Sequence, residues 1–295
     1  MNGVLLLNKP QGMTSHDCVA KVRRALGTKK VGHTGTLDPD VDGVLPICVG
    51  SATKLVQFLT AETKEYIGEV TIGYSTTTED SSGEIVAQHP VNKIFSQEEI
   101  DQLLQSMLGT STQIPPMYSA VKVGGKKLYE YARANIQVER PKREITIYEL
   151  ELLGDIHHCD GLLKFKFRIL GSKGIYIRTV AVTIGENLGY PAHMSDLTRI
   201  ASGNFKLEDC VTFDEIASGE YKLLTVSETL ANFPTTIVDN WVEKLVKNGV
   251  KLRDGQIMPP MKKGKFLVKG KDGEPLSIHE WSEKRQGYVS VRGLW

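Results

Sequence analysis

The sequence lacks the features that mark membrane, secreted and redox proteins. Its 295 residues hold only four cysteines, none in C-x-x-C spacing, so neither a zinc ribbon nor a redox pair is indicated. No apolar run approaches the roughly 20 residues of a membrane span. The start, MNGVLLLNKP, has no basic segment and too short an apolar run for a signal peptide. We therefore expect a cytoplasmic protein with reduced cysteines.

An excess of charge of one sign is also missing, because the net charge is only +1. The charges are nevertheless unevenly distributed, with acidic residues dominating from Glu62 to Asp101 and basic residues clustering at 21–30 and 122–143. Such basic clusters could neutralise RNA phosphates, although a solvated face is their commoner meaning. With 40% hydrophobic residues, the chain is long enough for one large domain and a small one.

A possible metal cluster at His157, His158 and Cys159 has a simpler explanation. Asp160 and Gly161 follow directly, between two strand-like runs, and this pattern is typical of a solvated hairpin turn. We therefore assign no metal to the protein.

The stretch from Val31 to Gly50, VGHTGTLDPDVDGVLPICVG, sets a polar loop against a buried strand at 44–49. Pro39 fixes its own φ and pushes Asp38 out of the helical region, so Asp38 is expected on a stiff, non-helical loop. A carboxylate held in this way could act as a nucleophile. Three glycines permit backbone angles closed to other residues: Gly32, Gly35 and Gly43.

Other interpretations of this loop are weaker or undecided. The pattern D-x-D-x-D-G from Asp38 to Gly43 opens like a calcium loop, but the twelfth position is Val49 instead of a bidentate glutamate. No phosphate-cradling glycine motif is present. A purely structural turn remains possible. The loop by itself thus leaves a reactive carboxylate and a structural turn as alternatives.

Hydrophobic periodicity predicts an α+β chain. The segment SKGIYIRT is expected to be a strand that becomes a helix after Arg178, so that Tyr176 and Arg178 share one face. The pattern loosens from Leu224 to Asn240 into a linker. The expected strands lie at 3–7, 44–49, 64–74, 143–153 and 162–170, and the expected helices begin near Ser15, Ser51 and Ser96.

Four motifs together make the chain resemble the TruB family, the bacterial tRNA pseudouridine-55 synthases. They are GVLLLNKPQGMTSHD, GHTGTLDPDVDGVLPICVG, IPPMYSAVKVGGKKLYEYAR and SKGIYIRT, in the family's order. The resemblance implies a pseudouridine-synthase fold with a mixed, largely antiparallel sheet flanked by helices. It also implies a catalytic domain at 1–238 and a small β-rich, PUA-like RNA-binding module at 239–295.

The same resemblance implies roles for individual residues. Asp38 matches the catalytic aspartate, Arg178 its arginine partner, and Tyr66 a residue for base stacking and proton transfer. The implied substrate contacts are His33, Tyr66, Tyr176 and Leu197, and Lys9, Lys126 and Lys127 are expected on the RNA backbone. No cofactor is implied.

The implied activity is isomerisation of uridine to pseudouridine at position 55, in the TΨC arm of tRNA, by a monomer. The target would be flipped out of the RNA. Asp38 could attack C6 of uracil or C1′ of ribose, or assist elimination to a glycal, and the sequence does not choose among these routes. Two other functions stay open: a guide-RNA-dependent synthase subunit, and a tRNA-folding chaperone with secondary catalysis.

Overall fold

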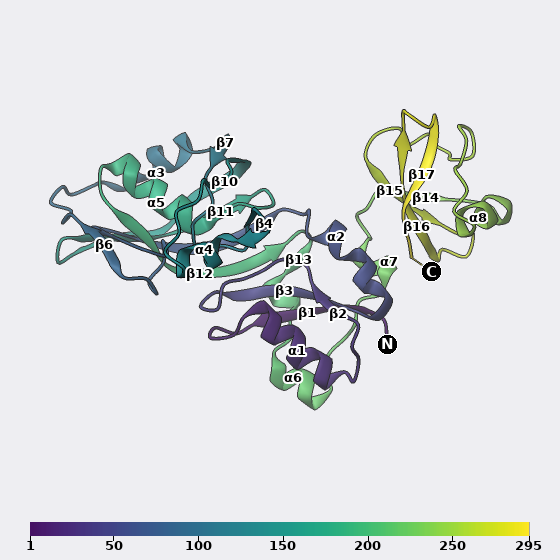
Figure 1. The fold of residues 1–295 in the computed structure, drawn as a ribbon, viewed down its shortest axis with the longest axis horizontal. Coiled ribbons are helices and arrows are strands. Elements are labelled where there is room, and N and C mark those ends of the chain that lie inside the picture. Colours follow the sequence, from purple (N-terminus) through teal and green to yellow (C-terminus); the bar gives the residue numbers. More distant parts are fainter. Residues whose placement is uncertain (295) are drawn as a thin grey trace.

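The computed structural model describes residues 1–294, so Trp295, the last residue of the predicted C-terminal module, lies outside the described residues. The molecule is elongated, with a large sheet along most of its length and a small sheet at one end (Figure 1). This confirms the predicted α+β class with a mixed main sheet and a small C-terminal sheet.

The main sheet is antiparallel except where β12 runs parallel to β3. The β12–β3 pairing matters for function, because β3 follows the Asp38 loop directly. The strands lie in the order β1 (Gly3–Lys9), β3 (Asp42–Val49), β12 (Ala192–Ser202), β4 (Lys64–Ile72), β11 (Leu162–Gly171), β10 (Arg143–Cys159) and β7 (Gly109–Gln113), while β2 (Val31–His33) pairs with β3 and β13 (Phe205–Lys206) with β12.

Helices begin where the sequence supplies caps. Thr14 and Asp17 form a capping box at α1 (Ser15–Ala25), and Ser96 and Glu99 form another at α3 (Gln97–Ser106). The remaining short elements around the main sheet are η1 (Gly50–Leu55), α2 (Val56–Leu59), β5 (Tyr74–Thr76), β6 (Ile85–Gln88), β8 (Lys122–Val123), β9 (Lys126–Lys127), α4 (Leu128–Arg133), η2 (Leu207–Asp209), α6 (Phe213–Ser218) and α7 (Val226–Thr229).

The SKGIYIRT segment differs from its prediction. Helix α5 (Ile177–Leu188) already begins at Ile177, with Tyr176 as its N-cap, so Arg178 lies in the first helical turn and not on a strand. The strand β11 ends at Gly171, and a turn through Gly174, whose φ is +80°, intervenes. Period-two spacing therefore does not explain why Tyr176 and Arg178 lie near one another.

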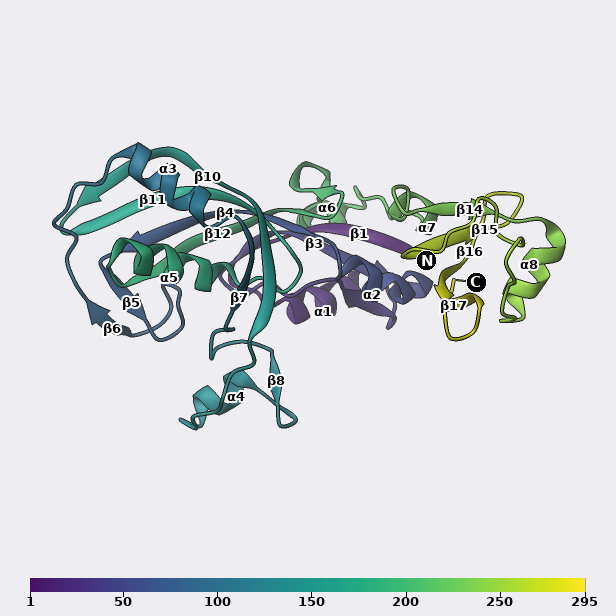
Figure 2. The ribbon, with the colours of Figure 1, turned by 90° about the horizontal axis from the view of Figure 1, so that it is seen from above.

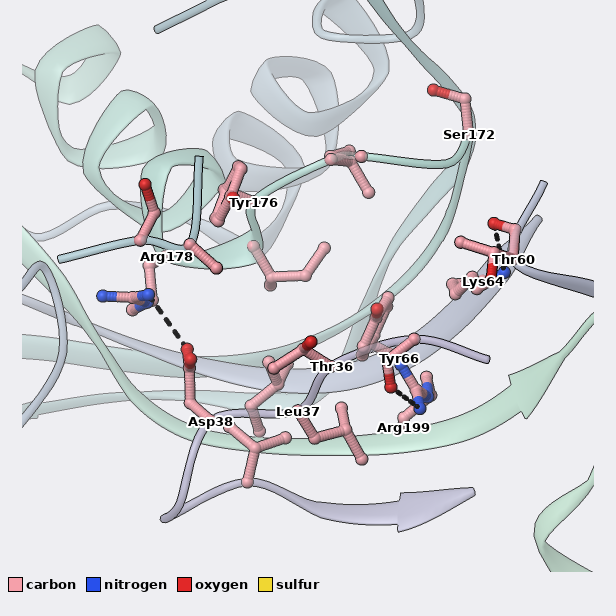
Figure 3. A pocket seen from close by; sticks show the side chains of 18 of the residues that line it. Thr36, Leu37, Asp38, Thr60, Lys64, Tyr66, Ser172, Tyr176, Arg178 and Arg199 are labelled. Atoms are coloured by element: carbon pink, nitrogen blue, oxygen red, sulfur yellow. Dashed lines mark hydrogen bonds and ion pairs between the residues drawn. The ribbon is translucent and has the colours of Figure 1, made fainter. Parts of the chain in front are cut away.

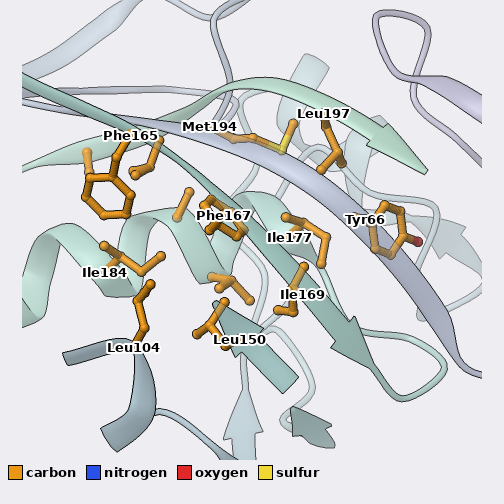
Figure 4. Close-up of a cluster of buried hydrophobic side chains, with 14 of the residues drawn as sticks. Tyr66, Leu104, Leu150, Phe165, Phe167, Ile169, Ile177, Ile184, Met194 and Leu197 are labelled. Carbon is orange, nitrogen blue, oxygen red and sulfur yellow. The ribbon is translucent and has the colours of Figure 1, made fainter. Parts of the chain in front are cut away.

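The largest hydrophobic core fills the space between the main sheet and helices α3 and α5 (Figure 4). Phe165 and Phe167 of β11 are buried there beside Ile184 of α5. At one side this core ends in Tyr66 of β4 and Leu197 of β12, which are 8% and 6% exposed. Two of the predicted substrate contacts are thus mounted on the rigid core.

The C-terminal sheet has the order β14 (Thr235–Ile237), β15 (Lys265–Lys269), β16 (Pro275–Ser282) and β17 (Gly287–Gly293), and helix α8 (Asn240–Lys247) packs on it. Because β14 belongs to this sheet, the module begins before the predicted boundary at 238/239. Leu267 and Ile278 share a buried cluster with Phe58 and Leu59. The small sheet is therefore packed against the large domain.

One segment stands away from the body. The hairpin of β8 and β9, with α4, projects from the main sheet on two long connections (Figure 2).

Within residues 1–294, no helix has the length and apolarity needed to cross a membrane.

Gly43 determines how closely β3 approaches β12. Its φ is +105°, and a Cβ there would lie 2.8 Å from the Arg199 nitrogen and collide with the Arg199 carbonyl oxygen. We predict that Gly43→Ala lowers the free energy of unfolding by about 2–4 kcal/mol, because backbone strain and overpacking add.

The matched control is Gly109→Ala, whose φ is +97° but whose Cβ would meet nothing within 4 Å. This change should lower the free energy of unfolding by only about 1–2 kcal/mol, because it introduces backbone strain without overpacking. Urea denaturation measures both values, and equal losses would show that close approach to β12 is unimportant.

Candidate active site

The Asp38 loop is fastened to α1 and β1 by buried polar groups. The Ser15 hydroxyl accepts a hydrogen bond from the Leu37 amide at 2.8 Å and donates one to the Leu37 carbonyl at 3.1 Å. The Gly12 amide donates to the Pro39 carbonyl at 2.9 Å. Of the three glycines in this stretch, Gly43 uses its conformational freedom to adopt a positive φ, whereas Gly32 and Gly35 do not. The stiffness of the loop comes from these contacts more than from its glycines.

Lys9 does not contact RNA as predicted. It is fully buried, and its Nζ donates to the carbonyl oxygens of Val41, Pro39 and Pro10 at 2.6, 3.1 and 2.9 Å. An ammonium enclosed by three carbonyls is unavailable to a phosphate. Lys9 instead ties the segment that follows Asp38 to β1.

Arg178 is held by a clamp that points it at Asp38. Its side chain is 5% exposed, and Nη2 lies 3.0 Å from Asp38 Oδ2 (Figure 3). Nη1 donates to the Thr78 carbonyl at 2.7 Å and Nη2 to the Tyr118 carbonyl at 2.8 Å. Asp80 Oδ2 lies 3.5 Å from Nη1. Because several groups fix the guanidinium, it can orient the Asp38 carboxylate.

The electrostatics of Asp38 are a balance of opposing effects. The side chain keeps 44% of its surface accessible, but protein atoms crowd its other sides, and this burial raises its pKa. The Arg178 guanidinium lowers the pKa of Asp38, the Asp80 carboxylate raises it, and the Lys9 ammonium lowers it. Arg178 is therefore the principal group that favours the ionised carboxylate.

A cavity of about 270 Å³ extends from Asp38 and Arg178 along the edge of the core (Figure 3). Tyr66, Tyr176 and Leu197 line it. Burial raises the pKa of the Tyr176 phenol, which stays neutral. His33 does not line this cavity; it lies on β2, opposite Ile47 of β3, where burial lowers the pKa of its imidazole.

Two cationic side chains that the sequence reasoning overlooked line the same cavity, at the end away from Asp38 (Figure 3). Lys64 precedes Tyr66 by two residues on β4, and Arg199 follows Leu197 by two residues on β12. Since side chains alternate along a strand, each shares a face with a predicted cavity residue. That spacing was a usable signal. Asp80, in the loop after β5, had no comparable signal.

Lys126 and Lys127 lie on the projecting hairpin, but their surroundings differ. Lys126 is exposed. Lys127 is half-buried, with its ammonium 5.3 Å from the centre of the Tyr129 ring. Of these two lysines, Lys126 has the side chain that is more open to a phosphate contact.

Comparison with known proteins agrees with this geometry. Residues 23–177 match the profile of the TruB family pseudouridylate synthase N-terminal domain, and residues 178–231 match a tRNA pseudouridylate synthase B C-terminal domain. A tRNA pseudouridine synthase B of Geobacillus thermodenitrificans is 58% identical over 98% of both chains. One of Bacillus cytotoxicus is 53% identical over 98% of this chain and 95% of the relative.

Among solved structures, a Cbf5–Nop10–Gar1 complex contains a chain that is 25% identical, with a TM-score of 0.75, over 99% of this chain and 85% of that one. A chain in an H/ACA RNP bound to a substrate RNA is 22% identical with a TM-score of 0.72, which shows a shared fold. The fold similarity thus extends over nearly the whole chain.

The position of Lys9 generates a prediction about stability. Replacing it in Lys9→Met removes three charge-assisted hydrogen bonds and leaves buried carbonyls unpaired, so the free energy of unfolding should fall by about 2–3 kcal/mol. The exposed change Lys29→Met, expected to stay within about 0.5 kcal/mol, is the control. Similar results for both in urea denaturation would contradict the structural role of Lys9.

Proposed function

We propose, because the chain belongs to the TruB family of pseudouridylate synthases, that it isomerises uridine 55 in the TΨC arm of tRNA. The observation that carries this proposal is the Asp38–Arg178 pair at one end of a cavity lined by two tyrosines and a leucine. This arrangement suits a single flipped nucleotide, whose base needs apolar walls and whose reacting carbon needs a carboxylate.

Asp38 is proposed as the nucleophile. Moving ribose from N1 to C5 of uracil requires the base to be detached, turned and reattached, and a carboxylate can begin this by adding to C6 or C1′ or by assisting elimination. Each route needs the ionised form. Arg178 favours that form and holds one carboxylate oxygen at 3.0 Å, which leaves the other free to react.

Tyr66 is proposed to stack on the flipped base. Flipping costs a few kcal/mol because the base is unstacked, and stacking of the flipped base on an aromatic ring offsets about 1–3 kcal/mol of this cost. Tyr66 is buried in the core and presents itself to the cavity beside Leu197. Its hydroxyl is also proposed to take part in proton transfer at C5. Tyr176 and Leu197 would keep water from the base, and His33 would contact RNA outside the cavity.

Two alternative functions are separable by experiment. A guide-RNA-dependent subunit, suggested by the fold shared with Cbf5, would be inactive on tRNA without a guide. A folding chaperone would keep its effect on tRNA when the nucleophile is removed. Purified protein incubated with unmodified tRNA, followed by mapping of pseudouridine, tests the proposed function directly.

Asp38→Asn should abolish pseudouridine formation while tRNA affinity stays within about tenfold, because the amide keeps the shape but loses nucleophilicity. Single-turnover assays with saturating tRNA measure the first effect and filter binding the second. Turnover at the wild-type rate would remove Asp38 from the mechanism.

The projecting hairpin generates a second prediction. Lys126→Ala should weaken tRNA binding and reduce the slope of log affinity against log salt by somewhat under one unit, because one phosphate contact is lost. Lys93→Ala is the control, since that lysine pairs with Glu99 on α3. Equal slopes for wild type and Lys126→Ala would place Lys126 on a solvated face.

A further inference from the structure

The cavity end opposite Asp38 carries two buried cations without a counter-ion. Arg199 is 1% exposed and Lys64 is 6% exposed, and both line the cavity (Figure 3). Within residues 1–294, neither forms an ion pair with a carboxylate. The Asp38 end, in contrast, has two carboxylates around Arg178. The unbalanced positive charge therefore lies at the Lys64–Arg199 end.

Backbone carbonyls hold both side chains in place. Lys64 Nζ donates to the Glu62 carbonyl at 2.7 Å and, at longer range, to those of Thr60 and Leu59. Arg199 Nε donates to the Val44 carbonyl at 2.7 Å, and Nη2 to the Gly35 carbonyl at 3.3 Å.

The third nitrogen of the Arg199 guanidinium, Nη1, does not take part in these hydrogen bonds. Among the described residues it has no acceptor, and it would lie only 3.5 Å from a Cβ at Gly35, which lines the cavity. A glycine at this position keeps a side chain from standing between the guanidinium and the cavity.

Carbonyl dipoles satisfy hydrogen bonds but do not neutralise a charge, so burying two cations together is costly. The effect is visible at Lys64, where burial and the neighbouring Arg199 lower the pKa to about 8. The Glu62 carboxylate opposes this shift, but its effect is the smallest of the three. An anion in the cavity would relieve the repulsion, and the geometry therefore indicates a site built for negative charge.

The reaction itself generates such a charge. Breaking the N1–C1′ bond leaves its electron pair on the base, where it spreads over N1, O2 and O4; addition of a carboxylate to C6 instead pushes a pair toward C5 and O4. Each route therefore places negative charge on a carbonyl oxygen of uracil. The base is also the part of a flipped nucleotide that reaches deepest, and Tyr66, proposed to stack on it, lies opposite Arg199 on paired strands and two residues from Lys64.

Resting on the function proposed above, we propose that Arg199, with the charge of Lys64 beside it, stabilises the negative charge that develops on the carbonyl oxygens of the target uracil. Preorganised donors aimed at developing charge are among the largest contributions to catalysis. Arg199 supplies the donor that faces the base, and Lys64 supplies a second positive charge while it anchors the end of α2.

The first test is Arg199→Gln in single-turnover assays with saturating tRNA. The rate should fall at least about 100-fold while the dissociation constant for tRNA stays within about threefold. Arg168→Gln is the matched control, because Arg168 pairs with Glu65 and Glu149 and does not line the cavity. A full rate for Arg199→Gln would overturn the proposal.

A second test separates chemistry from a structural defect. Sulfur accepts hydrogen bonds more weakly than oxygen, so tRNA with 2-thiouridine or 4-thiouridine at the target should lose much of the contribution of Arg199 at the carbonyl that Arg199 contacts. At that position, Arg199→Gln should therefore slow the reaction of the thio-substituted tRNA less than it slows the reaction of the uridine tRNA. If Arg199→Gln slows the uridine tRNA and both thio-substituted tRNAs by the same factor, the proposal is overturned. Lower tRNA affinity with an unchanged bound-state rate would also overturn it, because Arg199 would then contact a phosphate.

The pH profile tests Lys64 even if Arg199→Gln fails to fold. Lys64 is charged below its pKa, so with subsaturating tRNA the wild-type rate should fall as pH rises through about 8. Lys64→Arg stays charged and should move this fall to higher pH. Identical profiles would remove Lys64 from the proposal. If wild type forms no pseudouridine at all, the proposed function has failed, independently of Arg199.

Discussion

The structure around the cavity depends on keeping one carboxylate charged where burial favours its neutral form. Arg178 does most of this, and its own position depends on the start of α5 and on the carbonyls of Thr78 and Tyr118. Asp38 in turn depends on Lys9, which ties its loop to β1. Segments far apart in the sequence thus meet to fix a single ion pair.

Buried cations held by carbonyl oxygens are the recurring device of this site. Lys9, Lys64 and Arg199 all donate to backbone carbonyls and form no ion pair among the described residues. A carboxylate partner would neutralise such a charge. Carbonyl groups carry no net charge, so they fix the position of the cation but do not cancel its electrostatic potential. The consequence is a cavity whose one end favours an ionised nucleophile and whose other end favours an anion.

Much of the fold follows from local signals. Capping boxes at Thr14 and Ser96 start the expected helices, and alternation along 64–72 marks the strand that carries Tyr66. The start of α5 was missed because the β-branched residues after Ile175 fit a strand as well as a buried helix, and only the turn at Gly174 decides. The strand β14, three residues long, was too short to stand out from a linker.

The sequence by itself determined the family, the Asp38 loop and five of the residues that line the cavity, because loop motifs and strand periods are local properties. Tertiary structure alone decided what each charged side chain does. Lys9 looked like a basic residue free for RNA, yet β1 places its ammonium among three carbonyls. Lys64 and Arg199 are distant in sequence, and only the pairing of β4 with β12 brings both to one cavity end, where burial makes their charges count.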